Sequence, residues 1–211
     1  RPKLSGLIKR ITPAIAVLGL AILASITWRA ALRTPDAQLH VTVLEAGSGE
    51  AVLIQTPSGR YVLVNGGPSP SRLSDALGRR LSLGNQRLDW LVVASPDNED
   101  LSALPDTITR YTPTNVLWAG PTGGTRGASY LWRALVEVDI PVSRLQPGQA
   151  LDLGQGARLV ALTVGSRGAV FLLEWESFRM LLPLGLDFEA FEALEYGKSV
   201  GRVSALILAQ S

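Results

Sequence analysis

The chain has 211 residues, enough to bury the core of one ordinary domain and to carry a short additional segment. Apolar residues make up 46% of the chain and charged residues 18%, and 20 basic against 18 acidic side chains leave a net charge of +2. This composition excludes a disordered chain and gives no basis for polyanion binding by charge alone. The sequence has no cysteine, which excludes disulfides, thiol nucleophiles and cysteine metal sites.

An uncharged, apolar run occupies residues 11–28, between Lys9-Arg10 and Arg29. Because about 18 apolar residues suffice to cross a bilayer, we predict one transmembrane helix over residues 11–32. Four basic residues precede the run within the flank 1–10 and two follow it. The positive-inside rule therefore predicts a cytoplasmic N-terminus and a soluble domain on the outer face. An export signal, the last helix of a larger membrane bundle, and a buried core helix are the alternatives.

A polar linker over residues 33–37 contains Pro35 and places a domain boundary near residue 37. Strands over residues 39–44, 51–55 and 60–64 form a predicted antiparallel meander. A helix over residues 73–83, capped by Ser71, precedes a buried strand over residues 88–94. The elements predicted further along the chain are a helix at 101–111, a strand at 115–119, a glycine-rich loop at 120–127, a helix at 128–138, strands at 151–153, 158–163, 169–175 and 178–182, a helix at 187–196 and a strand at 204–209.

Three loops that follow predicted strands concentrate glycine, carboxylate and amide residues. They read EAGSGE over residues 45–50, NGGP over residues 65–68 and SPDNED over residues 95–100. Ligands of layered α/β proteins are usually held at the carboxyl ends of strands. We therefore expect one site assembled from these three loops.

The segment VTVLEAGSGEAVLIQTPSGRYVLVNGG, followed by RLDWLVVASPDNEDLSAL, resembles the metallo-β-lactamase-fold domain of ComEC-type DNA internalisation (competence) proteins. The corresponding loops of that family read approximately D-V-G-Q-G-D-A, I-D-G-G and H-P-D-A-D-H. The resemblance covers residues 38–120 and is thinner over residues 152–211. It implies an α/β fold, a four-layer αββα sandwich over residues 38–211 that is truncated at the C-terminus and preceded by the transmembrane helix.

In the resembled family, two histidines and two aspartates of the third loop hold metal ions that activate a water for attack on an ester. The matching positions in this chain are Ser95, Asp97, Glu99 and Asp100. Both imidazoles are thus replaced, while the negative charge is kept. By the same match, the resemblance gives four further binding positions: Glu45, Glu50, Asn65 and, near the place of a Thr-Gly-Asp turn, Asp187.

The chain has a single histidine, His40, at the start of a predicted strand. A two-zinc centre needs several imidazoles, and a Ser-His-Asp triad needs one beside its serine. We therefore predict no catalytic residue, no metal and no cofactor, with the carboxylates of residues 97–100 stabilising the N-terminus of the next helix. The alternative is a working phosphodiesterase-like or nuclease-like hydrolase with Mn²⁺ or Mg²⁺ on the carboxylates of Asp97, Glu99, Asp100 and Asp187.

The predicted function is that of a catalytically inactive structural or binding module, anchored in the cell membrane by a single pass. By resemblance, its partners would be DNA or a membrane channel protein; a relict without a role is a third hypothesis. A basic face toward DNA could be formed by Arg72, Arg79, Arg80 and Arg87, although a solvated helix face is the ordinary explanation for such arginines. Arg126 and the amides of residues 120–127 could meet a phosphate, but a flexible loop is the simpler interpretation.

Overall fold

The computed structural model describes residues 17–25, 27, 36–48, 50–81, 86–184 and 200–207. The chain divides into two compact units, Arg1–Asp36 and Ala37–Ser211. In the first unit, residues 17–25 and 27 are helical, with exposed apolar side chains such as Leu20 and Leu23. Within the described ranges, no helix is both long enough and apolar enough to cross a membrane. The rest of the predicted span over residues 11–32 lies outside those ranges.

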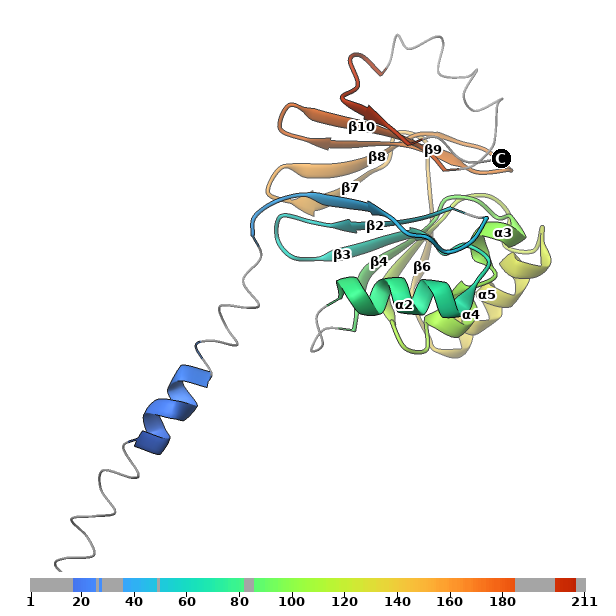
Figure 1. Cartoon of the computed structure of the whole chain (residues 1–211). Coiled ribbons are helices and arrows are strands. Elements are labelled where there is room, and N and C mark those ends of the chain that lie inside the picture. Colours follow the sequence, from blue (N-terminus) through green and yellow to red (C-terminus); the bar gives the residue numbers. More distant parts are fainter. Residues whose placement is uncertain are drawn as a thin grey trace, which may run out of the picture. The chain divides into compact units, whose positions relative to one another are not determined.

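The second unit contains two sheets (Figure 1). The first sheet has six strands in the order β1-β2-β3-β4-β5-β6. Their bounds are β1 His40–Val43, β2 Ala51–Gln55, β3 Tyr61–Asn65, β4 Leu88–Val93, β5 Pro113–Trp118 and β6 Val142–Arg144. β1, β2 and β3 form the antiparallel meander that the sequence predicts, and β3 to β6 run parallel.

The second sheet has the order β11-β10-β9-β8-β7. Its strands are β7 Ala150–Gly154, β8 Ala157–Val164, β9 Ala169–Trp175, β10 Phe178–Pro183 and β11 Ala205–Leu206. All neighbours are antiparallel except β10 and β11. The predicted turn at Glu176-Ser177 joins β9 to β10, and Glu176 takes the left-handed conformation with φ 52°.

Helices cover one face of the first sheet. They are α2 Pro70–Arg80, α3 Asn98–Leu101, α4 Leu104–Thr107 and α5 Arg126–Glu137. Leu73, Leu104 and Leu131 from these helices share a buried cluster with Leu63 and Leu91 of β3 and β4. The opposite face of the sheet packs on the second sheet in a separate buried cluster. The described residues thus form three layers, and the helix predicted at 187–196, which would start a fourth, lies outside them.

The helix predicted over residues 101–111 is wrong as a single element. Two short helices, α3 and α4, stand in its place, and α3 begins at Asn98. Pro105 explains the break, because it has no backbone N–H and is tolerated only in the first turn of a helix, where α4 has it. The predicted cap of α2 also moves, since Ser69 and not Ser71 accepts a hydrogen bond from the Arg72 backbone N–H.

Two strands at the sheet edges differ from the prediction. The three-residue strand β6 follows Pro141 and was not predicted, since its sequence, Val-Ser-Arg, is too short to show an alternating pattern. The final strand, predicted over residues 204–209, covers Ala205–Leu206 in the described range 200–207.

The packing between the two sheets depends on large side chains such as Phe171, which is 2% exposed. We expect Phe171→Ala to lower the free energy of unfolding by about 3–5 kcal/mol, because it removes a large apolar side chain and leaves a cavity. Urea denaturation gives the value. Tyr130→Ala, at an exposed position of α5, is the matched control and should cost under about 1 kcal/mol. Equal losses in the two variants would contradict this description of the core.

Candidate functional site

The three predicted loops meet at one end of the first sheet. We call residues 44–48, 50, 65–69 and 94–103 the loop cluster. The Ser69 backbone N–H donates to the Ala46 carbonyl at 3.3 Å, and the Glu50 backbone N–H donates to Asp100 Oδ1 at 2.9 Å. The backbone N–H groups of Gly66 and Gly67 donate to the Asp100 carbonyl at 2.8 and 3.0 Å. The prediction that these segments come together is therefore confirmed.

Asn65 lies at the centre of the loop cluster and is fully buried. Its Oδ1 accepts hydrogen bonds from the backbone N–H groups of Ala94 at 2.8 Å and Ser95 at 3.2 Å. Its Nδ2 donates to the Leu184 carbonyl at 3.3 Å. The side chain thus joins the ends of β3, β4 and β10. Its φ of 54° is a left-handed conformation that asparagine tolerates better than most residues.

Two tightly packed glycines follow Asn65. A Cβ on Gly66 would lie 2.6 Å from Cδ2 of Leu104, and a Cβ on Gly67 would lie 2.6 Å from that of Ala46. Gly67 also has a φ of 71°, which favours glycine. The Gly67 carbonyl accepts from the Ala103 backbone N–H at 3.0 Å. These glycines let two loops approach each other at backbone distance, which no larger residue permits.

Glu50 and Asp100 are the two carboxylates that the structure brings together. Burial, and secondarily the charge of Asp100, raise the pKa of Glu50 to about 7. Within the described ranges, neither carboxylate oxygen of Glu50 has a hydrogen-bond partner. Burial also raises the pKa of Asp100, and Asp97 and Glu99 add to the rise. Hydrogen bonds from the Glu50 backbone N–H and the Ser95 side chain lower the pKa of Asp100 in part.

Of the other predicted site residues, Ser95 hydrogen-bonds Asp100, and Asp97 and Glu99 act on it through their charges. Glu45, Asp97 and Glu99 are exposed, and Ser95 is buried with its Oγ accepting from the Asp97 backbone N–H at 3.2 Å. Asp97 stands at the N-cap position of α3, but its side chain makes no capping hydrogen bond. Asp97 therefore does not cap α3 through its side chain, whereas Glu99 and Asp100 lie in the first turn of α3, where the helix dipole favours negative charge. The predicted position Asp187 lies outside the described residues.

Two polar residues that the sequence reasoning missed connect the loop cluster to α5. Asn98 Oδ1 accepts from the Gly127 backbone N–H at 2.7 Å. Thr125 Oγ1 donates to the Pro96 carbonyl at 2.5 Å and accepts from the Ala128 backbone N–H at 3.1 Å. Thr125, directly before a helical pattern, is an N-cap signal that the sequence offered. These two bonds occupy the backbone N–H groups of Gly127 and Ala128, so neither is left to meet a phosphate at the start of α5.

The residues present do not fit a two-metal centre. His40 is exposed on β1 and pairs with Gln55, at the end of the sheet opposite the loop cluster. Asn65 is neutral and both ends of its amide bind backbone groups. Across the part of the chain that the structure describes, no three His, Cys, Asp or Glu side chains lie close enough to hold a metal ion. A carboxylate pair, Glu50 and Asp100, is what the site retains.

Comparison with solved structures identifies the architecture. The chain superposes on the Rm3 metallo-β-lactamase with a TM-score of 0.51 at 14% identity, covering 77% of this chain and 72% of that one. The chain has the metallo-β-lactamase fold. A HARLDQ-motif mutant (S60) of a metallo-β-lactamase from Cronobacter sakazakii gives a TM-score of 0.53 at 12% identity, covering 76% and 71%.

A similar score comes from a much longer protein of this fold. CmlA, a diiron β-hydroxylase from Streptomyces venezuelae, gives a TM-score of 0.52 at 16% identity over 80% of this chain. The match spans only 34% of the CmlA chain. No family model matches the sequence, and no curated protein matches it. At these identities the likeness concerns the metallo-β-lactamase fold alone.

We expect Glu50→Gln to remove a pH dependence from the stability of the chain. Because the pKa of Glu50 is raised from 4.5 to about 7, folding favours its protonated form, and wild-type stability falls as pH rises from about 4.5 to 7. The variant should match wild type at pH 4 and exceed it by about 1–2 kcal/mol at pH 8. Urea denaturation across this range measures the difference. Glu45→Gln, on the exposed side of the same loop, should leave the profile unchanged, and a flat difference for Glu50→Gln would contradict the burial described above.

We expect Asn65→Asp to destabilise the chain by about 2–4 kcal/mol at pH 7, because a carboxylate cannot donate to the Leu184 carbonyl and would be charged while buried. The loss should shrink below pH 5, where a protonated aspartic acid can donate again. Denaturation at pH 7 and pH 4.5 tests both statements. Asn115→Asp, at a half-buried position of β5, is the control. A variant as stable as wild type would show that the Asn65 amide is not needed as a donor.

Proposed function

We propose that this chain is a membrane-anchored module of the metallo-β-lactamase fold that positions or binds a partner and does not hydrolyse an ester. The observation that carries the proposal is the set of hydrogen bonds that the Asn65 side chain makes within the protein. Where the resembled family has an acidic residue, this chain has a neutral amide. Among the described residues, this amide binds the backbone groups of Ala94 and Ser95 after β4 and of Leu184 after β10. The loop end is thus held by hydrogen bonds within the protein.

The kind of partner follows from the resemblance of the loops to ComEC-type DNA internalisation proteins. We propose DNA, or a membrane channel protein that handles DNA, as the ligand of this module. The apolar run over residues 11–28 is the proposed anchor, and it would hold the domain at the outer face of the cell membrane. Neither binding of this partner nor anchoring in the membrane requires a metal ion.

A second candidate function is supported by Glu50. Both oxygens of its carboxylate lack hydrogen-bond partners in the described residues, and the carboxylate lies against Asp100. Oxygen ligands of this kind suit Mn²⁺ or Mg²⁺. In this alternative, the two carboxylates would hold one divalent cation that keeps several water ligands, in a hydrolase that acts on phosphodiesters. The ion would supply a Lewis acid there.

Metal analysis separates the two candidates. For the module, we expect elemental analysis of the purified full chain to find no stoichiometric Zn, Mn or Fe. Millimolar Mn²⁺ or Mg²⁺ should then leave the melting temperature within about 1 °C, since an ion that does not bind the native state cannot stabilise it. Hydrolysis of a chromogenic phosphodiester should stay at the buffer rate, and fluorescence anisotropy with labelled single- and double-stranded DNA then tests the partner.

The opposite outcome supports the hydrolase. One Mn²⁺ or Mg²⁺ per chain, lost in both Glu50→Gln and Asp100→Asn but kept in Glu45→Gln, would overturn the module proposal. Hydrolysis that requires the same two carboxylates would then be the activity. If the chain binds neither metal nor DNA at physiological salt, DNA is excluded as its ligand, and a protein partner is the next candidate to test.

A further inference from the structure

β6 forms an open edge of the first sheet. It is the last strand in the order, and β5 is the strand beside it. The Pro141 carbonyl accepts from a backbone N–H of β5, and the Leu145 N–H donates to a carbonyl of β5, both at 2.9 Å. Because backbone groups alternate between the two sides of a strand, those of Val142 and Arg144 point away from β5. Among the described residues, no hydrogen bond occupies these outward groups.

One flank of α5 lies beside this edge. The opposite flank faces α3, where the Gly127 N–H donates to a side-chain oxygen at 2.7 Å. At 3.6 residues per turn, Trp132 and Val136 lie roughly 140° and 180° around the helix from Gly127. The Trp132 ring meets that of Trp118 edge-on, with centroids 6.0 Å apart, and Trp118 pairs with β6. Trp132 and Val136 therefore border the edge strand, and we call them the α5 flank.

Exposed apolar side chains gather around the α5 flank. Among the described residues of the second unit, seven large apolar side chains are exposed, and four of them belong to α5 or to the residue after it: Tyr130, Trp132, Val136 and Val138. Val142 of β6 packs against the apolar cluster beneath the helices, so the helix side of the edge is apolar as well. Exposed apolar side chains that cluster in this way mark an interaction site.

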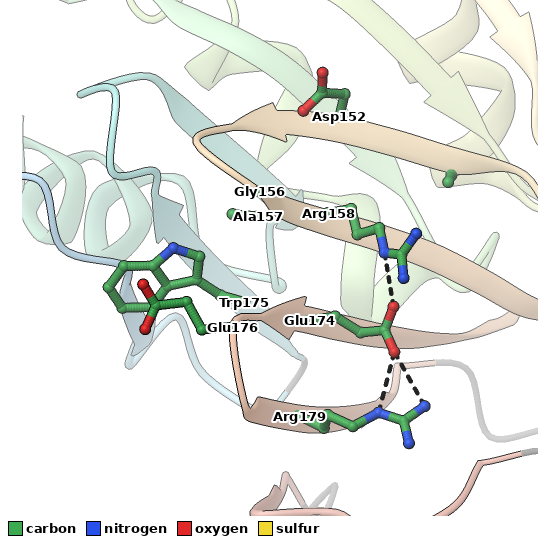
Figure 2. A pocket seen from close by; sticks show the side chains of 9 residues that line it. Asp152, Gly156, Ala157, Arg158, Glu174, Trp175, Glu176 and Arg179 are labelled. Carbon is green, nitrogen blue, oxygen red and sulfur yellow. Dashed lines mark hydrogen bonds and ion pairs between the residues drawn. The ribbon is translucent and has the colours of Figure 1, made fainter.

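The edge of the second sheet is protected in a way that β6 is not. β7 carries the exposed Asp152, and its register with β8 shifts between Asp152 and Gly154. Figure 2 shows the charges that continue from Asp152 across this sheet, where the Glu174 carboxylate lies between the guanidinium groups of Arg158 and Arg179. Charged side chains and irregular registers block pairing at a sheet edge. β6 has a regular register with β5, and the α5 flank lies beside it.

We propose that β6 and the α5 flank are the interface with a second copy of this chain, whose β6 pairs antiparallel to the first about a two-fold axis through Ser143. In this register, Val142 of one copy lies opposite Arg144 of the other. Both residues have outward N–H and C=O groups, so each pair exchanges the N–H···O bonds of directly opposite residues. Arg144 faces a valine and not its own copy, which keeps like charges from lying directly opposite each other.

The same axis brings the two α5 flanks together. The Ile140 N–H donates to the Leu135 carbonyl at 3.0 Å, so the end of α5 lies near the start of β6 and the helix runs antiparallel to the strand. The flank of one copy therefore meets that of the other with the order of its residues reversed, Trp132 against Val136. The exposed Arg133 and Glu137, one turn apart, are then opposed by the opposite charge of the second copy. A short strand alone buries too little area for a specific interface, and the two flanks supply the remainder.

Sedimentation velocity of the purified full chain tests the proposal. We expect a monomer–dimer equilibrium with a Kd on the order of 10 µM, because the interface is small. Val136→Glu should weaken the dimer at least ten-fold, since it places a charge in each apolar flank. Tyr130→Glu is the matched control, because Tyr130 is equally exposed on α5 but lies on the side that faces α3. It should dimerise as wild type does.

A cross-link tests the register separately, because the sequence has no cysteine. The axis places the two Ser143 Cα atoms about 4.5 Å apart, within the range of a disulfide. Mild oxidation should therefore convert Ser143→Cys to a covalent dimer. Ser71→Cys, at an exposed position of α2, is the control and should stay monomeric.

Three outcomes would overturn the proposal. They are a wild-type chain that stays monomeric at about 200 µM, twenty times the expected Kd, a dimer that Val136→Glu leaves intact, and Ser143→Cys that cross-links no faster than Ser71→Cys. The second outcome would assign the association to another surface, such as the apolar run over residues 11–28. Unchanged circular dichroism shows that each variant is folded. If Val136→Glu does not fold, the comparison of the two cysteine variants decides the question.

Discussion

The hydrogen bonds of the Asn65 side chain are the constraint on which the loop end of this sandwich depends. The amide, at the end of β3, binds two backbone N–H groups just after β4 and a carbonyl just beyond β10 of the second sheet. Removing such a buried group leaves backbone donors and acceptors without partners, and each costs about 1–3 kcal/mol. Two covalently remote parts of the chain, 119 positions apart, are thereby held in one arrangement.

That arrangement explains why the carboxylates behave as they do. The Asp100 carbonyl accepts from the backbone N–H groups of both glycines after Asn65, and Asp100 Oδ1 accepts from the Glu50 backbone N–H. These bonds hold the Asp100 side chain beside Glu50, the residue before β2. The Glu50 carboxylate is then buried beside that of Asp100, and this burial raises the pKa of Glu50. In this metallo-β-lactamase fold, the acidity of the third loop is thus partly structural: Asp100 anchors two other loops, while Asp97 and Glu99 remain on the surface.

Much of this architecture could be predicted from the sequence, because strands with strong apolar patterns and loops rich in glycine are local signals. The bounds of β2 and β9 agree with prediction, as does the assembly of the three loops. Pro105 is a local signal for the break between α3 and α4, but the apolar spacing of the segment favoured a single helix in the prediction. The role of Asn65 could not be predicted, because its donor reaches Leu184, which no local pattern connects to it. The row of charged side chains on the second sheet (Asp152, Arg158, Glu174 and Arg179) is also non-local, since it depends on the registers of three strand pairs.

Asn65 and Gly66 form an asparagine-glycine pair, the dipeptide in which the following backbone nitrogen most easily attacks the side-chain amide and releases ammonia. Here the Gly66 nitrogen already donates to the Asp100 carbonyl, and the Asn65 amide is held at both ends inside the protein. The folded chain therefore protects the Asn65 side-chain amide from deamidation. A chain in which the loop end unfolds loses that protection. Conversion of Asn65 to aspartate would then destabilise the refolded loop end, because a carboxylate cannot donate to the Leu184 carbonyl.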